Sequence, residues 1–246
     1  RKNLGLRTAR ENLDDLVDPG SFLEFGAFAV AAQRNRRDYE ELQLETSADG
    51  ILTGFCNINE DEVGEDNSHA AAIIYDYSVL AGSQGFFHHQ KLDRICEKAE
   101  EFSLPVVIFT EGGGGRPGDT DVTTQIAGLH IPSFSTWARL TGKCLKIAVN
   151  NGYCFAGNAV LFGCSDFMIA TKQSWIGMAG PAMIEGGGLG VYDPKEIGPA
   201  EEQYKNGVLD YLAEDEKEAT FIAKKLLSYF QGNLSDWSID DQTKLR

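Results

Sequence analysis

The chain has 246 residues, enough to bury a sizeable core as one large domain or two small ones. Its formal net charge of -15, with 24% charged and 42% hydrophobic residues, fits an acidic globular protein and argues against nonspecific nucleic-acid binding. No apolar run approaches the roughly 20 residues of a membrane span, and the start of the chain has no signal-peptide pattern.

In the first half of the chain, a helix is followed by strands that alternate with helices. The acidic stretch from Asn59 to Asn67 lies between two β-rich runs and indicates a hairpin connection. The predicted elements are a helix at 7–17, strands at 51–58 and 70–80, an amphipathic helix at 84–102 and a buried strand at 106–110.

The second half continues the alternation. It predicts a helix at 133–141, a strand at 146–150, a Gly/Ala-rich turn and helix at 152–163, a strand at 166–171 and an amphipathic helix at 219–230. Strands that alternate with helices indicate an α/β fold with parallel pairing.

Five cysteines are present, and no two are spaced as CxxC, so the sequence predicts no metal site. Reduced, partly buried thiols suit a reducing compartment, and we expect a cytoplasmic location. These cysteines are Cys56, Cys96, Cys144, Cys154 and Cys164.

A run of glycines follows the strand predicted at 106–110. The segment from Glu111 to Asp121 reads EGGGGRPGDTD, and consecutive glycines let the backbone approach a ligand closely. Their N–H groups can converge on an anion or a developing oxyanion. The segment lacks the P-loop and GxGxxG patterns, and a flexible surface loop is the alternative interpretation.

A second small-residue turn follows the strand predicted at 146–150. Gly152, Ala156 and Gly157 would let the chain turn sharply into a packed helix, although small residues also serve close helix packing alone. Two strand ends with backbone donors together indicate a site for an enolate or thioester oxyanion. This hypothesis requires Gly113 and Gly157 to share one cleft.

Side chains suited to conventional catalysis are scarce, since the chain has four histidines, no GxSxG elbow and no HExxH. This scarcity favours chemistry on backbone donors with a base supplied from elsewhere. The glycine-rich segment 175–199 is either an ordered loop near a site or a surface excursion. The cluster Arg34, Arg36 and Arg37 is either a phosphate contact or a solvated loop.

Several segments together resemble the carboxyltransferase domain of biotin-dependent acyl-CoA carboxylases, in the crotonase superfamily. The resemblance runs from about Arg7 to the end and covers the N-terminal, acyl-CoA-binding half of such a domain. It implies an α/β fold of the crotonase (ClpP/crotonase-like) ββα-superhelix type. The segments are DGILTG, YDYSVLAGSQG, VVIFTEGGGGRPGDTD, GYCFAGNAVLFGCSD and IGMAGPAMIEGGGLGVYDPKEIGP, and the last three look like the subgroup with large, fused carboxylase chains.

The resemblance implies carboxyl transfer from carboxybiotin to the α-carbon of an acyl-CoA. Carboxybiotin releases CO2, the biotin enolate takes the α-proton, and the acyl enolate attacks CO2 while backbone N–H groups hold the thioester oxyanion. The family's oxyanion glycines map onto Gly113 and Gly114, with Gly115 adjoining. Its second pair maps onto Ala156 and Gly157.

The resemblance also implies CoA contacts and partners. Ala81, Gly82 and Ser83 match the segment that lines the CoA pocket, and the three arginines resemble a CoA-phosphate contact. Expected partners are the acyl-CoA, the second carboxyltransferase half, and biotin carboxyl carrier and biotin carboxylase domains, in a trimer or a hexamer. Residues 1–232 would form the domain, and 233–246 a polar linker toward the second half.

Two residues depart from the family pattern, and three other functions stay open. Tyr153 replaces an expected basic residue and Trp175 a small polar one, which bears on the acyl-chain preference. The alternatives are a sodium-pumping, biotin-linked acyl-CoA decarboxylase, an enoyl-CoA hydratase or isomerase with Glu111 or Glu185 as base, and a CoA-binding, oligomerising module inactive alone.

Overall fold

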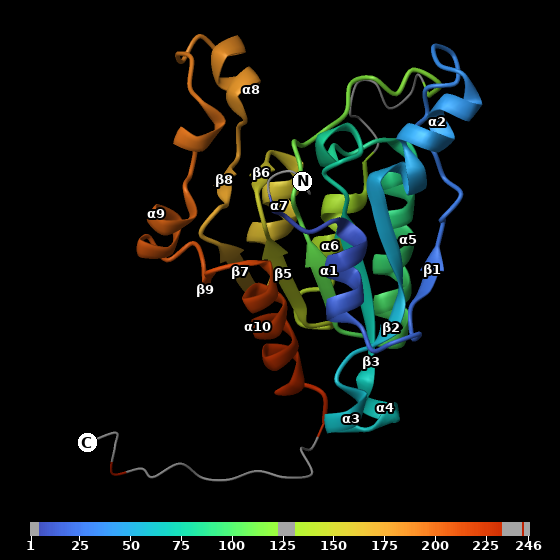
Figure 1. Ribbon diagram of the computed structural model, residues 1–246, viewed down its shortest axis with the longest axis vertical. Helices are drawn as coiled ribbons and strands as arrows, with labels where there is room; N and C mark the ends of the chain where they lie inside the picture. The colour runs from blue at the N-terminus through green and yellow to red at the C-terminus, as the bar shows by residue number, and fades with distance from the viewer. Residues whose placement is uncertain (1–4, 123–130, 233–242, 244–246) are drawn as a thin grey trace.

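A computed structural model describes residues 5–122, 131–232 and 243 of the chain. In this part, a twisted seven-stranded sheet has the order β1-β2-β3-β4-β5-β7-β9, and helices cover both of its faces (Figure 1). The strands are β1 (Leu23–Phe25), β2 (Ile51–Asn57), β3 (His69–Tyr75), β4 (Val106–Phe109), β5 (Lys146–Asn150), β7 (Phe167–Thr171) and β9 (Tyr211–Ala213).

The sheet is antiparallel at one edge and parallel elsewhere. β2 pairs antiparallel with β1 and β3, whereas β3, β4, β5, β7 and β9 run parallel. A second sheet pairs β6 (Tyr153–Phe155) in parallel with β8 (Trp175–Gly177). The carboxyl ends of parallel strands share one edge, where α/β proteins usually bind ligands.

The helices of the described residues vary from single turns to 17 residues. They are α1 (Ala9–Leu16), α2 (Tyr39–Glu45), α3 (Glu60–Val63), α4 (Glu65–Ser68), α5 (Phe86–Phe102), α6 (Ser133–Arg139), α7 (Gly157–Gly163), α8 (Pro181–Gly186), α9 (Ala200–Lys205) and α10 (Glu216–Ser228). No helix in the described ranges is long and apolar enough to cross a bilayer.

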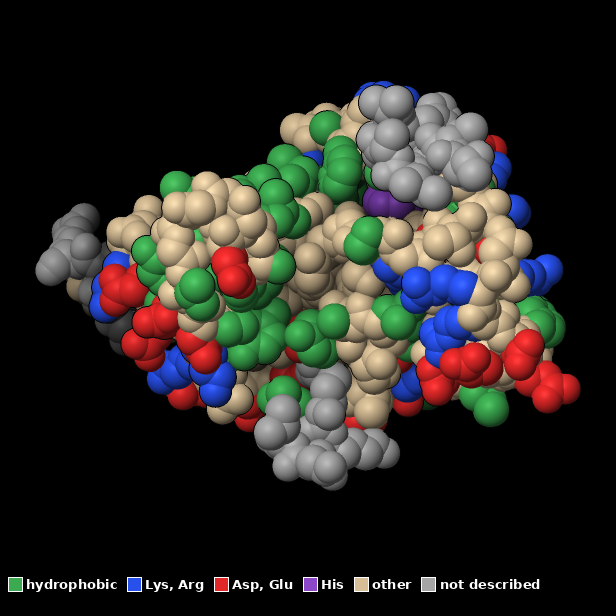
Figure 2. All heavy atoms as spheres, turned by 90° about the horizontal axis from the view of Figure 1, so that it is seen from above, with side chains coloured by type: hydrophobic (Ala, Val, Ile, Leu, Met, Phe, Trp, Pro, Cys, Tyr) green, Lys and Arg blue, Asp and Glu red, His purple; other side chains and the backbone are tan. Residues whose placement is uncertain are grey.

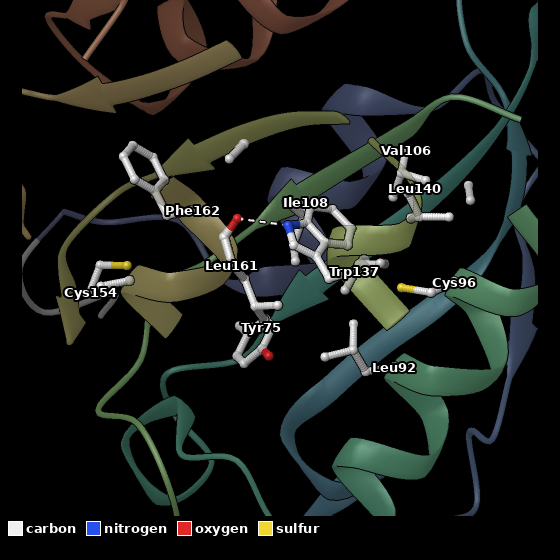
Figure 3. Packing of buried hydrophobic residues seen from close by; sticks show 14 of the residues in the cluster. Tyr75, Leu92, Cys96, Val106, Ile108, Trp137, Leu140, Cys154, Leu161 and Phe162 are labelled. Carbon is white, nitrogen blue, oxygen red and sulfur yellow. Dashed lines mark hydrogen bonds between the residues drawn. The ribbon is translucent and has the colours of Figure 1, made fainter. Parts of the chain in front are cut away.

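The core has two layers because alternate strand residues point to opposite sheet faces. Ile73 and Ile108 face α5, α6 and α7, whereas Ile74 and Val107 face α1 and α10. In the first layer Trp137 is fully buried, and its Nε1 donates to the carbonyl of Leu161 at 2.9 Å (Figure 3). The indole N–H is therefore satisfied inside an apolar layer.

At the carboxyl edge of the parallel strands the surface is hollowed. Seen from above, Lys and Arg side chains gather on the side of α2, and apolar side chains on the side of α8 (Figure 2). Between them lies an area of backbone and uncharged polar side chains (Figure 2). Both glycine turns belong to this end of the sheet.

The predicted fold class is confirmed, and the structure corrects two element boundaries. The strand predicted at 70–80 ends at Tyr75, because Asp76 accepts from the N–H and hydroxyl of Ser78 and turns the chain. In the turn and helix predicted at 152–163, residues 153–155 form the strand β6, and the helix begins at Gly157. The hairpin between β2 and β3 is confirmed, with α3 and α4 at its tip.

Candidate active site

The two glycine turns leave neighbouring parallel strands, β4 and β5, and are hydrogen-bonded to each other. The N–H of Gly112 donates to the carbonyl of Tyr153 at 2.7 Å, and the N–H of Phe155 donates back to Gly112 at 2.9 Å. The first turn therefore continues the pairing of the strands into β6. This arrangement fixes the register between the two turns.

The turns are in direct contact through Gly114 and Ala156. Gly114 has φ of +90°, and a methyl group there would lie 2.7 Å from the Cβ of Ala156 and 3.6 Å from the nitrogen of Gly157. Ala156 itself has φ of +52° and ψ of -120°, a conformation that costs a non-glycine residue on the order of 1–3 kcal/mol. The two turns that the sequence analysis paired thus lie side by side.

Asn158 links the two turns through its side chain, a role that the sequence analysis did not predict. Its side chain is fully buried, and its Oδ1 accepts from the N–H of Gly114 at 3.0 Å. Its Nδ2 donates to the carbonyls of Thr110 at 3.1 Å and Gly82 at 3.4 Å. The sequence offered one indication of this role, because Asn158 is a polar residue near the start of a helix that was predicted to be tightly packed.

The backbone donors of the turns fall into two classes. The N–H groups of Gly113 and Gly114 are used within the chain, by the carbonyl of Ala81 at 3.0 Å and by Asn158. No acceptor among the described residues meets the N–H of Gly115 or of Gly157. Gly115 is also exposed, with open space where a side chain would stand.

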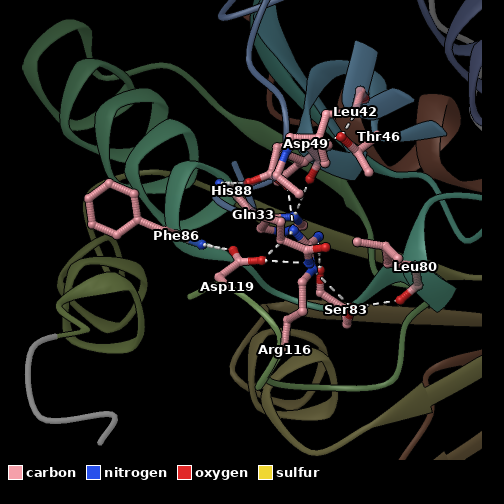
Figure 4. A network of polar contacts seen from close by, with 12 residues as sticks. Gln33, Leu42, Thr46, Asp49, Leu80, Ser83, Phe86, His88, Arg116 and Asp119 are labelled. Atoms are coloured by element: carbon pink, nitrogen blue, oxygen red, sulfur yellow. Dashed lines mark hydrogen bonds and ion pairs between the residues drawn. The ribbon is translucent and has the colours of Figure 1, made fainter. Parts of the chain in front are cut away.

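Arg116 anchors the first turn through its side chain, which is 4% exposed (Figure 4). Its Nη1 lies 2.5 Å from Oδ1 of the fully buried Asp49 and 3.5 Å from Asp119. Its Nη2 and Nε donate to the carbonyl and hydroxyl oxygens of Ser83 at 2.7 Å and 3.2 Å. Asp119 and Asp49 in turn accept from the N–H groups of Phe86 and His88, so the turn is tied to α5 as well as to Ser83. No role for Arg116 was predicted from the sequence, because Asp49 and Ser83 lie 67 and 33 residues away along the chain.

The candidate CoA segment lies against the first turn. A methyl group at Gly82, which has φ of +62°, would lie 2.4 Å from the carbonyl oxygen of Glu111, so only glycine fits there. Ala81 is exposed and Ser83 half-buried. The N–H of Gln84 donates to the carbonyl of Gly114 at 2.8 Å, which completes the contact.

The three arginines of the basic cluster differ in their surroundings. Arg37 pairs with Glu41 at 2.7 Å and with Glu45, and the hydrogen bond to Glu41 is the main cause of its raised pKa. Arg34 stacks 4.7 Å above the ring of Tyr39. Arg36 reaches Gln33 and the backbone of the glycine loop near residue 118. The cluster thus borders the hollow, with the charge of Arg37 already paired.

The segment 175–199 begins beside the second turn and then extends into solvent. Trp175 packs on Tyr153 with ring centroids 5.0 Å apart, and Tyr153 contacts Tyr77 at 6.2 Å. Met178 and most residues of α8 are exposed, Glu185 included. Both interpretations of this segment therefore hold, each for a different part. Glu111, the other carboxylate named for the hydratase alternative, is buried against Gly152.

Comparison with known proteins gives consistent relatives. The family model of the carboxyl transferase domain matches residues 2–241. The methylmalonyl-CoA carboxyltransferase 12S subunit of Propionibacterium freudenreichii subsp. shermanii is 32% identical over 231 residues. The biotin-dependent long chain acyl-coenzyme A carboxylase beta4 subunit of Mycobacterium tuberculosis (strain ATCC 25618 / H37Rv) is 28% identical over 238 residues.

Two solved structures share the fold. A single-chain, multi-domain long-chain acyl-CoA carboxylase has a TM-score of 0.91 and 50% identity, covering 100% of this chain and 25% of that one. The transcarboxylase 12S structure, described as a hexamer with substrate bound, has a TM-score of 0.76 and 30% identity, covering 93% and 43%.

The curated relatives are longer than this chain. The alignments cover 93% of it but 41% of the 12S subunit, and 96% of it but 42% of the beta4 subunit. The match to the family model and the similarity to the 12S structure agree on the fold and on the relatives. This chain belongs to the carboxyl transferase domain family and has its crotonase-like fold.

Proposed function

We propose that this chain is the acyl-CoA-binding half of an enzyme that transfers a carboxyl group from carboxybiotin to the α-carbon of an acyl-CoA. The observation that carries the proposal is the pair of unoccupied N–H groups on adjoining turns, at Gly115 and Gly157. Two donors on adjoining turns suit one thioester oxygen. Carbon acids of this kind react through an enolate, whose oxygen gains charge as the proton leaves.

In this proposal the chain stabilises the enolate through its backbone. The amides of Gly115 and Gly157 bind the thioester oxygen, and removing one such donor typically lowers kcat by about 10²–10³-fold. Gly113, Gly114 and Ala156 shape the turns. Carboxybiotin, when present on its carrier domain, supplies the carboxyl group and the base.

The CoA moiety is assigned to the surroundings of the first turn. In this proposal Ala81, Gly82 and Ser83 contact the CoA beside the first turn. Arg34 and Arg36 contact its phosphates. Arg37 contributes less, because Glu41 and Glu45 already pair its charge. The 50% identity to a long-chain acyl-CoA carboxylase supports an acyl-CoA with an extended apolar chain as substrate.

The remaining partners follow from the family. We assign to the protein a second carboxyltransferase half, a biotin carboxyl carrier and a biotin carboxylase domain, a hexameric assembly like that named for transcarboxylase 12S, and a cytoplasmic location. The domain would comprise residues 1–232. The linker proposed at 233–246 lies outside the described residues, apart from residue 243.

The test is an assay of label transfer. The chain joined to its second half is mixed with a carrier domain bearing [14C]carboxybiotin and with acyl-CoAs of increasing length. We expect label in the acyl-CoA product, and avidin should abolish it. Release of CO2 from malonyl-CoA without transfer would identify a decarboxylase, and hydration of an enoyl-CoA would identify a hydratase.

A glycine pair tests the turn directly. Gly115→Leu places a side chain in open space at the proposed donor, so we expect an intact fold and at least 100-fold lower transfer. Gly163→Leu, at the end of α7, meets equally open space and serves as the matched control. Equal activity of the two variants would contradict the assignment of the site.

A further inference from the structure

A cavity of about 340 Å³ opens beside Gly115, between the first turn and the N-terminal end of α5. Its volume is in the lower range of pockets that hold small molecules. The described residues that line it include Phe86, His89, Gly115, Arg116, Asp119 and Ile131. One wall is therefore the turn that carries a free backbone donor.

Part of the lining is apolar. Phe86, Pro117, Val122 and Ile131 contribute carbon surface from three separate stretches of chain. The ring of His89 packs edge-on against Phe134, with the ring centroids 6.2 Å apart, so the apolar surface continues beyond the lining residues. These groups favour a ligand that gains from leaving water.

The charged groups of the lining already have partners. Arg116 is held by Asp49 and Asp119, and Asp119 also accepts from the N–H of Phe86 at 2.8 Å and from Gln33 at 3.0 Å. These contacts leave the cavity with no unpaired charge among its described lining residues.

The two uncharged polar groups are held in the same way. Gln84 donates to the hydroxyl of Tyr75 at 2.9 Å. His89 shares a 2.9 Å hydrogen bond with the hydroxyl of Ser133 through Nδ1. Burial, followed by the charge of Arg116, lowers the pKa of His89 to about 4, so the imidazole is neutral near pH 7.

This chemistry selects among possible occupants. A phosphate or carboxylate is bound most strongly by an unpaired cationic donor, and the guanidinium of Arg116 is committed to two carboxylates. A neutral chain needs only apolar contact and the exclusion of water. The apolar residues of the lining and the paired state of its polar ones fit the second kind of ligand.

We propose that this cavity receives the acyl chain of the thioester whose oxygen binds Gly115 and Gly157, and thereby sets the accepted chain length. The proposal rests on the proposed function. At roughly 30 Å³ per methylene, the value implied by transfer and cavity energies, the cavity holds about ten methylenes. Phe86, Val122 and Ile131 are then specificity-determining residues.

Binding affinity across a chain-length series tests the cavity independently of catalysis. With the wild-type protein, calorimetry should show the Kd for saturated acyl-CoAs falling about fourfold per added methylene, then levelling near ten carbons. A Kd that stays constant from acetyl-CoA to decanoyl-CoA overturns the proposal. This measurement needs no variant, so it cannot be lost to misfolding.

Variants then locate the chain. Val122→Trp fills the cavity, and we expect at least tenfold loss of kcat/KM for decanoyl-CoA with propionyl-CoA changed less than threefold. Phe86→Ala should move the optimum to longer chains. Met183→Trp, at a site on α8 that is 64% exposed, is the control.

The outcomes separate this proposal from the function beneath it. Transfer to acyl-CoAs with an unchanged chain-length profile in Val122→Trp and Phe86→Ala overturns the cavity assignment alone. If the wild-type protein transfers label to no acyl-CoA, the proposed function fails, whatever the calorimetry shows.

Discussion

The two turns at the candidate site are held in place by different means. The first, Gly112 to Gly115, is fixed by side chains from other parts of the chain, above all Arg116 and Asn158. The second, at Ala156 and Gly157, is fixed by close backbone packing and carries a strained alanine. The first should therefore be sensitive to distant polar substitutions, and the second to changes in side-chain size.

The largest expected effect comes from Arg116. Burial raises the pKa of Asp49 and the charge of Arg116 opposes that rise, so Arg116→Met leaves a buried carboxylate without its partner. Breaking a buried pair in this way costs about 3–5 kcal/mol, which urea unfolding should show. The double variant with Asp49→Asn should recover part of that loss, and full additivity would argue against the pair.

Asn158 comes next. Asn158→Leu removes the acceptor of the Gly114 N–H and the donor to the carbonyl of Thr110, both inside the protein. Unpaired buried polar groups cost about 1–3 kcal/mol each, so we expect about 3 kcal/mol of destabilisation and loss of transfer activity. Asn206→Leu, at the exposed end of α9, is the control and should change stability by less than about 0.5 kcal/mol.

Acid should lower the free energy of unfolding through His89, which lies beside the first turn. The pKa of His89 is lowered to about 4 in the folded protein, so between pH 6.5 and 4 the unfolded chain binds the proton and the folded chain does not. The contribution of His89 to stability is thus complete above pH 6.5 and falls as the pH drops, by about 2 kcal/mol at pH 5. His89→Gln should flatten this slope in urea titrations. A slope that stays unchanged would argue against a neutral buried imidazole.

The smallest effect concerns the second turn. Ala156→Gly relieves an unfavourable φ but adds backbone freedom to the unfolded chain, so the net change should stay within about 1 kcal/mol. Ala156→Val should instead destabilise by more than 2 kcal/mol, because Gly114 lies against this side chain. Thermal unfolding distinguishes the two. Equal effects would mean that packing does not hold this turn.

The parts of the fold that the sequence predicted are those with strong local signals. α5 and α10 show clear periodicity. The buried strand β4 is bounded by Pro105 and the glycine run, and β5 is followed closely by Gly152. β6, β8 and β9 are three residues each and pair only with distant strands, so no local pattern marks them. The glycine turns were visible because composition alone sets them apart.

What the sequence could not predict is which donors remain free. The distinction between Gly114 and Gly115 depends on Asn158, 44 residues further along the chain. The Asp49–Arg116 pair spans 67 residues. Such contacts form only when the sheet aligns its strand ends, so they cannot be predicted from the spacing of residues in the sequence. The cavity beside Gly115 likewise needs α5 and the loop in their folded places.

The hairpin tip formed by α3 and α4 lies at the opposite pole of the molecule from α2 and α8 (Figure 1). Gly64 lies between these helices, exposed, with φ of +80° and open space around its Cα. Exposed tips of this kind tolerate insertions. A fluorophore or affinity tag inserted there would report on assembly and turnover from a position remote from the chemistry, which gives this protein a ready attachment point for single-molecule work.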